Sequence, residues 1–268
     1  MKKIIFRLFL VVITSCSYAQ VSQISVSKAN DGMKLIVDGN DFMINGMNWD
    51  YFPIGTNYSY SLWNQSDDVI KAALDAEMGL LKNMGVNVIR QYVGAQPKWI
   101  QYIYENYGIY TMLNHSFGRY GLTINNAWVP VTDYSDPDTQ AFLMSEVTEL
   151  AETYKDTPGL LMFLLGNENN YGLFWAGAET EDFPDEEEKR DFIGEERGRP
   201  MYKLMNDASI KMKSIDASHP IAICNGDVLF IDIIAEECKD VDVFGTNMYR
   251  GPSFTDAFKI VKEKLDMP

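Results

Sequence analysis

The sequence is poor in basic residues, histidine and cysteine. Its 268 residues include 23 Lys and Arg against 38 Asp and Glu, which gives a net charge of −15. A chain this acidic repels phosphate groups, so nucleic acid and anionic membrane surfaces are excluded as expected partners. The two histidines and three cysteines do not form a zinc-binding pattern, and we expect neither a metal nor another cofactor.

Long apolar runs and glycine-rich loops are also missing. No stretch reaches the roughly 20 consecutive apolar residues of a transmembrane helix, and no phosphate-binding glycine motif follows an apolar run. These absences argue against a membrane-spanning protein and against a Rossmann-type nucleotide-binding fold. Hydrophobic residues make up 46% of the chain and charged residues 23%, which is typical of a globular domain with a sizeable core.

The N-terminus has the pattern of an export signal. Lysines precede a short apolar segment at 8–13, and Ala19 ends a small-x-small cleavage site, so residues 1–19 are interpreted as a signal peptide. A second interpretation is a lipoprotein signal, because the sequence ITSC at 13–16 has the form of a bacterial lipobox. We favour a secreted or periplasmic protein, and an outer-membrane lipoprotein anchored through Cys16 is the alternative.

Short apolar runs alternate with helical stretches along most of the chain, which predicts βαβ units and a parallel sheet of the α/β class. Polar residues gather after the runs, as at the mouth of a (β/α)8 TIM barrel, and about six βα units make that barrel incomplete. We expect a lead-in hairpin over 20–41 and a partial barrel domain over 42–268. The expected strands are 42–47, 86–90, 109–113, 160–165, 220–224 and 241–245, and the expected helices are 67–84, 97–107, one starting at Pro137, 200–215, 230–237 and 254–265.

The two cysteines after the signal are expected to stay apart. The predicted fold places Cys224 at the end of a strand and Cys238 at the far end of the helix that returns from it. A disulfide requires Cα atoms within about 7 Å. We therefore expect two buried thiols.

The segment Gly166-Asn167-Glu168 carries the clearest chemical signal. Six apolar residues lead up to it, so the carboxyl group of Glu168 is expected at the barrel rim beside a low-dielectric wall. Such surroundings disfavour the charged form of a carboxyl group and suit a proton donor, and the neighbouring amide can bind a substrate hydroxyl. This combination suits protonation of a glycosidic oxygen, although an Asn-Glu pair also serves as an ordinary polar cap of a strand.

Four segments in order resemble the barrel of the retaining glycoside hydrolases of clan A, and in particular glycoside hydrolase family 2. The segment 164–169 (LLGNEN) resembles the acid/base strand of that family. The other three are 43–48 (MINGMN), 85–90 (GVNVIR) and 241–249 (VDVFGTNMY), which resemble its first, second and sixth strands.

The resemblance implies a role for five residues. Glu168 would act as general acid and then as general base, and Asn167 would bind the 2-hydroxyl of the sugar. Arg90 and Tyr249 would donate hydrogen bonds to the nucleophilic carboxylate, and Asn247 would line the sugar subsite. Each of the last three also has a purely structural interpretation, as a strand-end ion pair, a half-buried ring or a loop cap.

Three further residues are expected at the rim from their positions alone. His115 follows the third expected strand, where either a sugar contact or a structural role fits equally well. Trp49 and Trp175 fall in segments that follow strands, where an indole can stack on a sugar ring. Plain packing is the competing interpretation, and we favour it for Trp63 and Trp128.

The family pattern is incomplete in this sequence. A retaining enzyme needs a second carboxylate roughly 5–5.5 Å from the first, and in the resembled family it lies at the end of the seventh strand. The residues expected to begin that strand are 265–268, and the other rim acids, Asp50 and Asp227, lie elsewhere. We therefore expect an N-terminal fragment of a longer enzyme.

The expected function is that of a secreted glycosidase that cleaves β-linked oligo- or polysaccharides with retention. Three alternatives remain open: a β-glucan transglycosylase, a non-catalytic carbohydrate-binding barrel, and an inactive fragment.

Overall fold

The computed structural model describes residues 20–268 except 30–31, 58, 93, 178–179 and 182–183. The expected signal peptide and the lipobox Cys16 lie outside these residues. The chain forms a sheet of six parallel strands in the order β13-β12-β9-β6-β5-β4. These strands are β4 (Gly46–Asn48), β5 (Val88–Tyr92), β6 (Tyr110–His115), β9 (Leu160–Leu165), β12 (Ile221–Gly226) and β13 (Val243–Asn247).

Helices connect these strands in sequence. They are α1 (Asp67–Asn83), α2 (Pro97–Tyr107), α3 (Pro137–Tyr154), α4 (Asn169–Gly172), α5 (Glu187–Ile193), α6 (Arg199–Ile215), α7 (Ile231–Glu237) and α8 (Thr255–Lys264). A short 3-10 helix η1 (Leu62–Asn64) precedes α1, and a π-helical turn η2 (Gly194–Gly198) leads into α6. The predicted α/β fold, an incomplete TIM barrel of six units, is confirmed.

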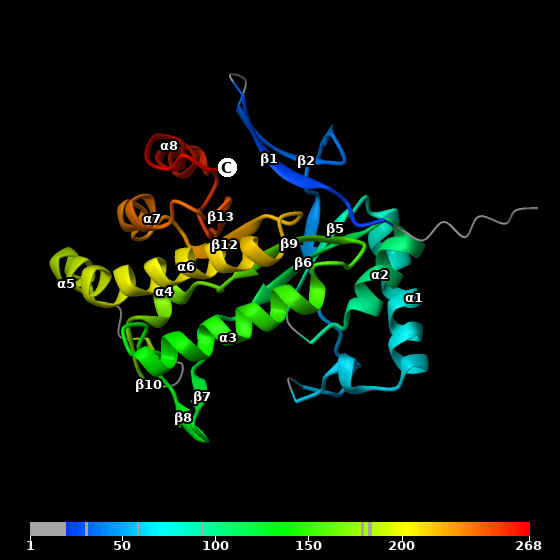
Figure 1. Ribbon diagram of the computed structural model, residues 1–268, viewed down its shortest axis with the longest axis horizontal. Coiled ribbons are helices and arrows are strands. Elements are labelled where there is room, and N and C mark those ends of the chain that lie inside the picture. Colours follow the sequence, from blue (N-terminus) through cyan, green and yellow to red (C-terminus); the bar gives the residue numbers. More distant parts are fainter. Residues whose placement is uncertain (1–19, 30–31, 58, 93, 178–179, 182–183) are drawn as a thin grey trace, which may run out of the picture.

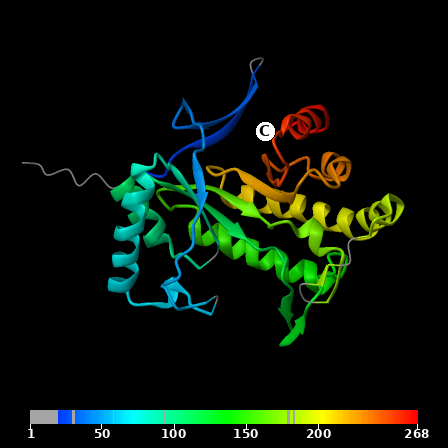
Figure 2. The same ribbon diagram turned by 180° about the vertical axis from the view of Figure 1, so that it is seen from behind.

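Two faces of the sheet are covered differently. Helices α3 and α6 lie along one face (Figure 1), where Leu143 and Met205 join a core cluster with Phe163 of β9. Figure 2 shows the molecule from the other side, with the opposite, inner face of the sheet toward the viewer. Strand β9 is buried on both faces of the sheet, and all six of its residues are apolar. This continuous apolar run is the pattern that predicts the strand from the sequence.

An antiparallel hairpin closes one end of the inner face. It consists of β1 (Ile24–Ala29) and β2 (Gly32–Val37), and a third short strand β3 (Asn40–Asp41) pairs with β2. Ile24 and Val37 pack on inner-face residues such as Tyr110, whose hydroxyl lies 3.0 Å from the Ser22 hydroxyl. The backbone N–H of Ile24 also donates to the carbonyl of Ser218, just before β12, so the hairpin covers the amino ends of the strands.

Small antiparallel pairs extend the loops at the opposite end. After β6, β7 (Leu122–Ile124) pairs with β8 (Ala127–Val129), and after β9, β10 (Trp175–Gly177) pairs with β11 (Thr180–Glu181). Helix α3 begins as the sequence predicts. Asp136 caps it by accepting a 2.8 Å hydrogen bond from the Thr139 backbone, with Pro137 in the first turn.

The first strand of the sheet is shorter than expected. The sequence predicts a strand over 42–47, but β4 covers only Gly46–Asn48. The side chain of Asn87 explains the difference, because its oxygen accepts from the Asn45 N–H at 2.8 Å and its amide donates to the Met43 carbonyl at 2.8 Å. Before residue 46 these side-chain bonds accompany a single backbone bond, from the Asn87 N–H to the Asn45 carbonyl at 3.0 Å, in place of a regular ladder.

Cys224 and Cys238 are both free and buried, as predicted. Burial raises the pKa of the Cys238 thiol to about 12 and also raises that of Cys224. Both are therefore neutral thiols at physiological pH. Among the described residues, no helix is long and apolar enough to cross a bilayer, and no group of His, Cys, Asp and Glu could hold a metal ion.

Gly159, just before β9, offers a test of the packing. It has φ +85°, and a Cβ at this position would lie 2.2 Å from the Cβ of Tyr104. Gly108 is also left-handed, at φ +67°, but a Cβ there meets nothing within 4 Å. We expect Gly108→Ala to cost about 1–2 kcal/mol from backbone strain alone. Gly159→Ala should add about 1–3 kcal/mol of steric overlap.

Urea unfolding of both variants measures this difference. Equal loss of stability in the two variants would contradict the close contact between Gly159 and Tyr104.

Candidate active site

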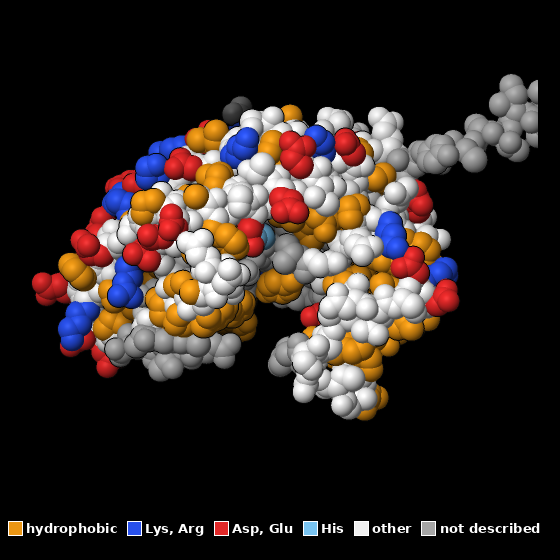
Figure 3. Space-filling model, turned by 60° about the horizontal axis from the view of Figure 1, so that its bottom comes forward, with side chains coloured by type: hydrophobic (Ala, Val, Ile, Leu, Met, Phe, Trp, Pro, Cys, Tyr) orange, Lys and Arg blue, Asp and Glu red, His pale blue; other side chains and the backbone are white. Residues whose placement is uncertain are grey.

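Polar side chains meet at the carboxyl ends of five neighbouring strands, β5, β6, β9, β12 and β13. Arg90, Asn114, Cys224 and Asn247 belong to four of these strands, and Glu168 follows the fifth. In a parallel barrel these strand ends form the mouth at which active sites lie. Figure 3 shows that the molecule is hollowed on this side, between the segment before α1 and the part that carries β7 and β8.

Glu168 is held in an unusual backbone conformation. Its φ of +58° places it in the left-handed region, which is uncommon for a residue other than glycine. The Glu168 N–H donates to the Cys224 carbonyl at 2.9 Å, and its carboxylate accepts from the Asn247 amide at 2.9 Å. Such local strain is retained where the surrounding structure fixes it, and it is frequent at functional sites.

Asn167 links the elements around Glu168. Its side-chain oxygen accepts from Arg90 Nη2 at 2.9 Å and from Asn247 Nδ2 at 3.1 Å. Its side-chain nitrogen donates to the Tyr120 hydroxyl at 3.3 Å. These bonds fix the orientation of the amide, with its oxygen toward Arg90 and Asn247 and its nitrogen toward Tyr120.

Arg90 is buried and oriented by a second asparagine. Arg90 Nε donates to the side-chain oxygen of Asn114 at 2.8 Å, and Nη2 donates to the same oxygen. The Asn114 amide in turn donates to the Gly166 carbonyl at 3.1 Å, just before Asn167. The guanidinium thus connects β5 and β6 to the Asn167-Glu168 segment and brings a positive charge into the site.

Cys224 lies on the inner face beneath the two asparagines. Its sulfur is 3.5 Å from the Asn247 side-chain oxygen and 3.9 Å from that of Asn167. Because burial raises the pKa of this thiol, it serves as a weak neutral donor to these oxygens. It helps to orient the Asn247 amide toward Glu168.

Two buried asparagines after Glu168 tie the site to neighbouring loops. Asn169 accepts from the Asn167 N–H at 2.8 Å and donates to the Phe117 carbonyl at 2.8 Å. Asn170 forms a pair of hydrogen bonds with the backbone of Gly226, at 2.8 and 2.9 Å. The Asn-Glu-Asn-Asn run therefore holds the loops after β6 and β12 in place.

The structure brings Glu168, Asn167, Arg90 and Asn247 of the predicted site together, and it holds two other predicted residues elsewhere. His115 faces α3, with Nε2 3.3 Å from the Glu146 carboxylate. Trp49 is buried against Trp63 in the core formed with α1 and α2. Neither contact is with Glu168, so a sugar contact for these two residues stays a prediction.

The remaining two predicted residues differ strongly in exposure. Tyr249 is 92% exposed, two residues beyond β13. Trp175 is buried, and the Arg119 guanidinium lies over its ring at 3.9 Å from the centroid. A hydrogen bond from Tyr249 to a nucleophile and a sugar stacked on Trp175 both stay predictions.

Sequence reasoning assigns no role to Asn114, Cys224 or Tyr120, which also belong to this cluster. Asn114 is the last but one residue of β6, and the rule that polar residues at the carboxyl ends of strands line the mouth places it there, without a role in the chemistry. Cys224 was expected only as a buried thiol. Tyr120 lies five residues beyond β6 in a loop whose path the sequence does not specify.

The carboxyl groups of the two other acids expected at the rim, Asp50 and Asp227, are hydrogen-bonded to residues other than Glu168 and its partners. Asp227 is paired with Arg250, which donates to it through Nε at 3.0 Å and through Nη2, and this arginine lowers the pKa of the carboxyl group. Asp50 is exposed and accepts from the Tyr51 N–H at 2.8 Å. We assign neither as a nucleophile.

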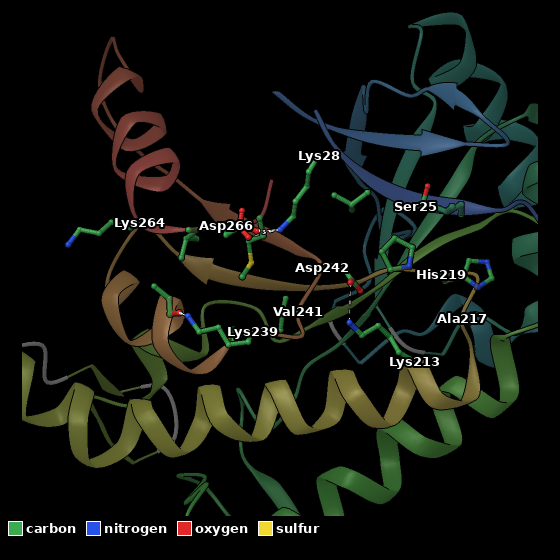
Figure 4. Close-up of a pocket in the computed structure, with 17 residues that line it drawn as sticks. Ser25, Lys28, Lys213, Ala217, His219, Lys239, Val241, Asp242, Lys264 and Asp266 are labelled. Carbon is green, nitrogen blue, oxygen red and sulfur yellow. Dashed lines mark hydrogen bonds and ion pairs between the residues drawn. The ribbon is translucent and has the colours of Figure 1, made fainter. Parts of the chain in front are cut away.

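A separate cavity of about 650 Å³ lies at the opposite end of the sheet. Figure 4 shows Lys28 and Ser25 of the hairpin lining it together with His219 and Asp242, which precede β12 and β13. The His219 side chain is fully buried, and its Nδ1 lies 2.7 Å from the Asp216 carboxylate. Because barrel active sites lie at the carboxyl ends of strands, we do not assign the active site to this cavity.

The fold is that of glycoside hydrolase barrels in partial form. A β-glucuronidase of Parabacteroides merdae matches with a TM-score of 0.55 and 16% identity, over 91% of this chain and 25% of that one. A β-1,4-D-mannanase from Cryptopygus antarcticus has a TM-score of 0.57 and 11% identity, over 86% of this chain and 73% of the mannanase. An agarase has a TM-score of 0.57 and 13% identity, over 92% of this chain and 48% of the agarase.

Comparisons of the whole sequence do not add a family to this structural likeness. No protein-family model matches the sequence, and no curated protein matches it. The chain spans about a quarter of the length of the β-glucuronidase structures that it resembles. The likeness therefore defines the fold, and the chemistry must be argued from the residues.

Proposed function

We propose that this protein is a glycoside hydrolase that cleaves β-linked oligo- or polysaccharides with retention, in the manner of family 2. Glu168 is the general acid in the first step and the general base in the second. Asn167 binds the 2-hydroxyl of the sugar at the cleavage point, and Arg90 supplies positive charge beside it. Asn247 orients Glu168.

The observation that carries this proposal is the hydrogen-bonded group of Glu168, Asn167, Asn247 and Arg90. An ordinary polar cap requires one or two bonds to nearby backbone. Here two side chains from two strands, Arg90 of β5 and Asn247 of β13, donate three hydrogen bonds to an Asn-Glu pair whose glutamate has a left-handed backbone. The acid/base of a glycosidase needs a carboxyl group fixed in this way beside an amide that can hold a sugar hydroxyl.

The attacking carboxylate of this mechanism is proposed at the end of a seventh barrel strand, outside the six strands of this sheet. Its distance from Glu168 should be roughly 5–5.5 Å, the separation that retention requires. We also propose that the protein acts outside the cytoplasm, since residues 1–19 have the pattern of an export signal.

A substrate panel tests the proposed activity on the complete gene product. The panel contains 4-nitrophenyl β-glycosides, including the β-glucuronide, together with β-1,4-mannohexaose and agarose. We expect turnover of at least one member and none of the matched α-glycosides. Absence of turnover with retained binding would favour the carbohydrate-binding alternative, and absence of both would overturn the proposal.

A further inference from the structure

The loop after β6 places an aromatic side chain beside Asn167. Tyr120 is 46% exposed, and its hydroxyl accepts the 3.3 Å hydrogen bond from the Asn167 side chain. Exposed aromatic residues are common singly on protein surfaces and need no explanation by themselves. Trp128 on β8 and Phe192 on α5 are exposed in this way, whereas Tyr120 is bonded to the amide next to Glu168.

The ring of Tyr120 is supported from within the protein. The Arg119 guanidinium lies 5.5 Å from the Tyr120 centroid and 3.9 Å from that of Trp175, and the two rings lie 6.4 Å apart. Arg119 Nε also donates to the Asn167 backbone carbonyl at 3.0 Å. Arg119 and Trp175 are thus a buried support for the Tyr120 ring. Both Arg119 and the Tyr120 hydroxyl are hydrogen-bonded to Asn167.

The loop itself is fastened at several points. Asn169 donates to the carbonyls of Ser116 and Phe117, and the Thr132 hydroxyl donates to the Gly118 carbonyl at 2.6 Å. A Cβ on Gly121 would lie 2.6 Å from the Val129 carbonyl, so the loop packs closely against β8. The loop is therefore held in position before any ligand binds, which lowers the entropy cost of binding.

We propose that Tyr120 is a sugar-binding residue that forms a stacking face for the ring of a β-linked saccharide adjoining the sugar held by Asn167. The apolar face of a pyranose suits an aromatic ring that is rigid and half exposed, and the Tyr120 hydroxyl sets the distance between that ring and Asn167. In this arrangement Trp175, which is only 6% exposed, supports Tyr120 rather than meeting the sugar itself. The inference rests on the proposed function, because it takes Asn167 as the neighbouring sugar contact.

Two substitutions separate stacking from hydrogen bonding. Tyr120→Ala removes the ring, and we expect KM for the best oligo- or polysaccharide substrate of the panel to rise about tenfold or more, with kcat changed less than about threefold. Tyr120→Phe keeps the ring, and its KM should stay within about threefold of the wild-type value. Phe192→Ala removes an exposed aromatic on α5 that is not part of the hydrogen-bonded cluster around Asn167, and it should leave both constants unchanged.

Direct binding to the best oligosaccharide of the panel, such as β-1,4-mannohexaose, measured by calorimetry, provides a second readout. Thermal melting of each variant confirms folding, which the half-exposed position of Tyr120 should preserve. Wild-type affinity and KM in folded Tyr120→Ala would overturn the inference and leave the proposed function intact. A fall in kcat with unchanged KM would also overturn it, because that pattern belongs to a residue that only positions Asn167.

A wild-type protein that neither binds nor cleaves any member of the panel would overturn the proposed function, and with it this inference.

Discussion

Replacing Glu168 with glutamine should lower kcat/KM for glycosides with poor leaving groups by about 10²–10⁴-fold, the usual contribution of a general acid. Glutamine has the same shape and can still accept the hydrogen bond from Asn247, so the fold should be retained. It cannot donate a proton to the departing oxygen. The loss should therefore shrink to about tenfold or less for dinitrophenyl glycosides, whose leaving groups need little protonation.

A plot of log kcat/KM against leaving-group pKa for both proteins measures this effect. Glu152→Gln is the matched control, because Glu152 lies on α3 in an exposed ion pair with Lys155. A Glu168→Gln variant with wild-type activity on alkyl glycosides would remove Glu168 as the acid. An equal loss for all leaving groups would indicate a role other than proton donation.

Replacing Arg90 with lysine should have the second largest effect. Lysine keeps the charge but cannot reproduce the planar arrangement in which Nε and Nη2 reach the oxygens of Asn114 and Asn167. Arg90 and Asn114 are buried, and leaving a buried acceptor unpaired costs about 1–3 kcal/mol. We expect a comparable loss in the free energy of unfolding and a fall in kcat/KM of about 100-fold or more, because Asn167 loses its orientation.

Urea unfolding and steady-state kinetics measure the two effects separately. Arg199→Lys is the control, since Arg199 is a partly exposed arginine of α6 that pairs with Glu195, Glu236 and Glu237. Such exposed pairs contribute about 1 kcal/mol or less, and we expect no change in activity. Wild-type activity in Arg90→Lys would contradict the role assigned to the guanidinium.

The strands and helices follow from the sequence where the signal is local. The helix over 97–107 and the strand over 160–165 have the predicted bounds. A capping aspartate with a following proline marks the start of α3, and an unbroken apolar run marks β9. The end of β9 then gives the position of Glu168, because a side chain that follows a buried parallel strand must emerge at the mouth.

Other features depend on contacts between distant residues. Asn87 shortens β4 through side-chain bonds across 42 and 44 positions of sequence. Residues at the end of a strand can also face either layer, and the sequence does not distinguish Asn114, which points to Arg90, from His115, which points to α3. Tyr120 reaches Asn167 from a loop that Asn169 and Thr132 hold in place through bonds to distant backbone, which no local pattern reveals.

The anomeric form of the first product tests the central claim most directly. Hydrolysis of the best β-glycoside by the complete gene product can be followed by proton NMR during the first minutes, before mutarotation equilibrates the sugar. A retaining mechanism with Glu168 as acid/base predicts that the β-anomer appears first and the α-anomer only later. Initial release of the α-anomer would contradict the mechanism, because it requires direct attack by water and a different placement of the second carboxylate.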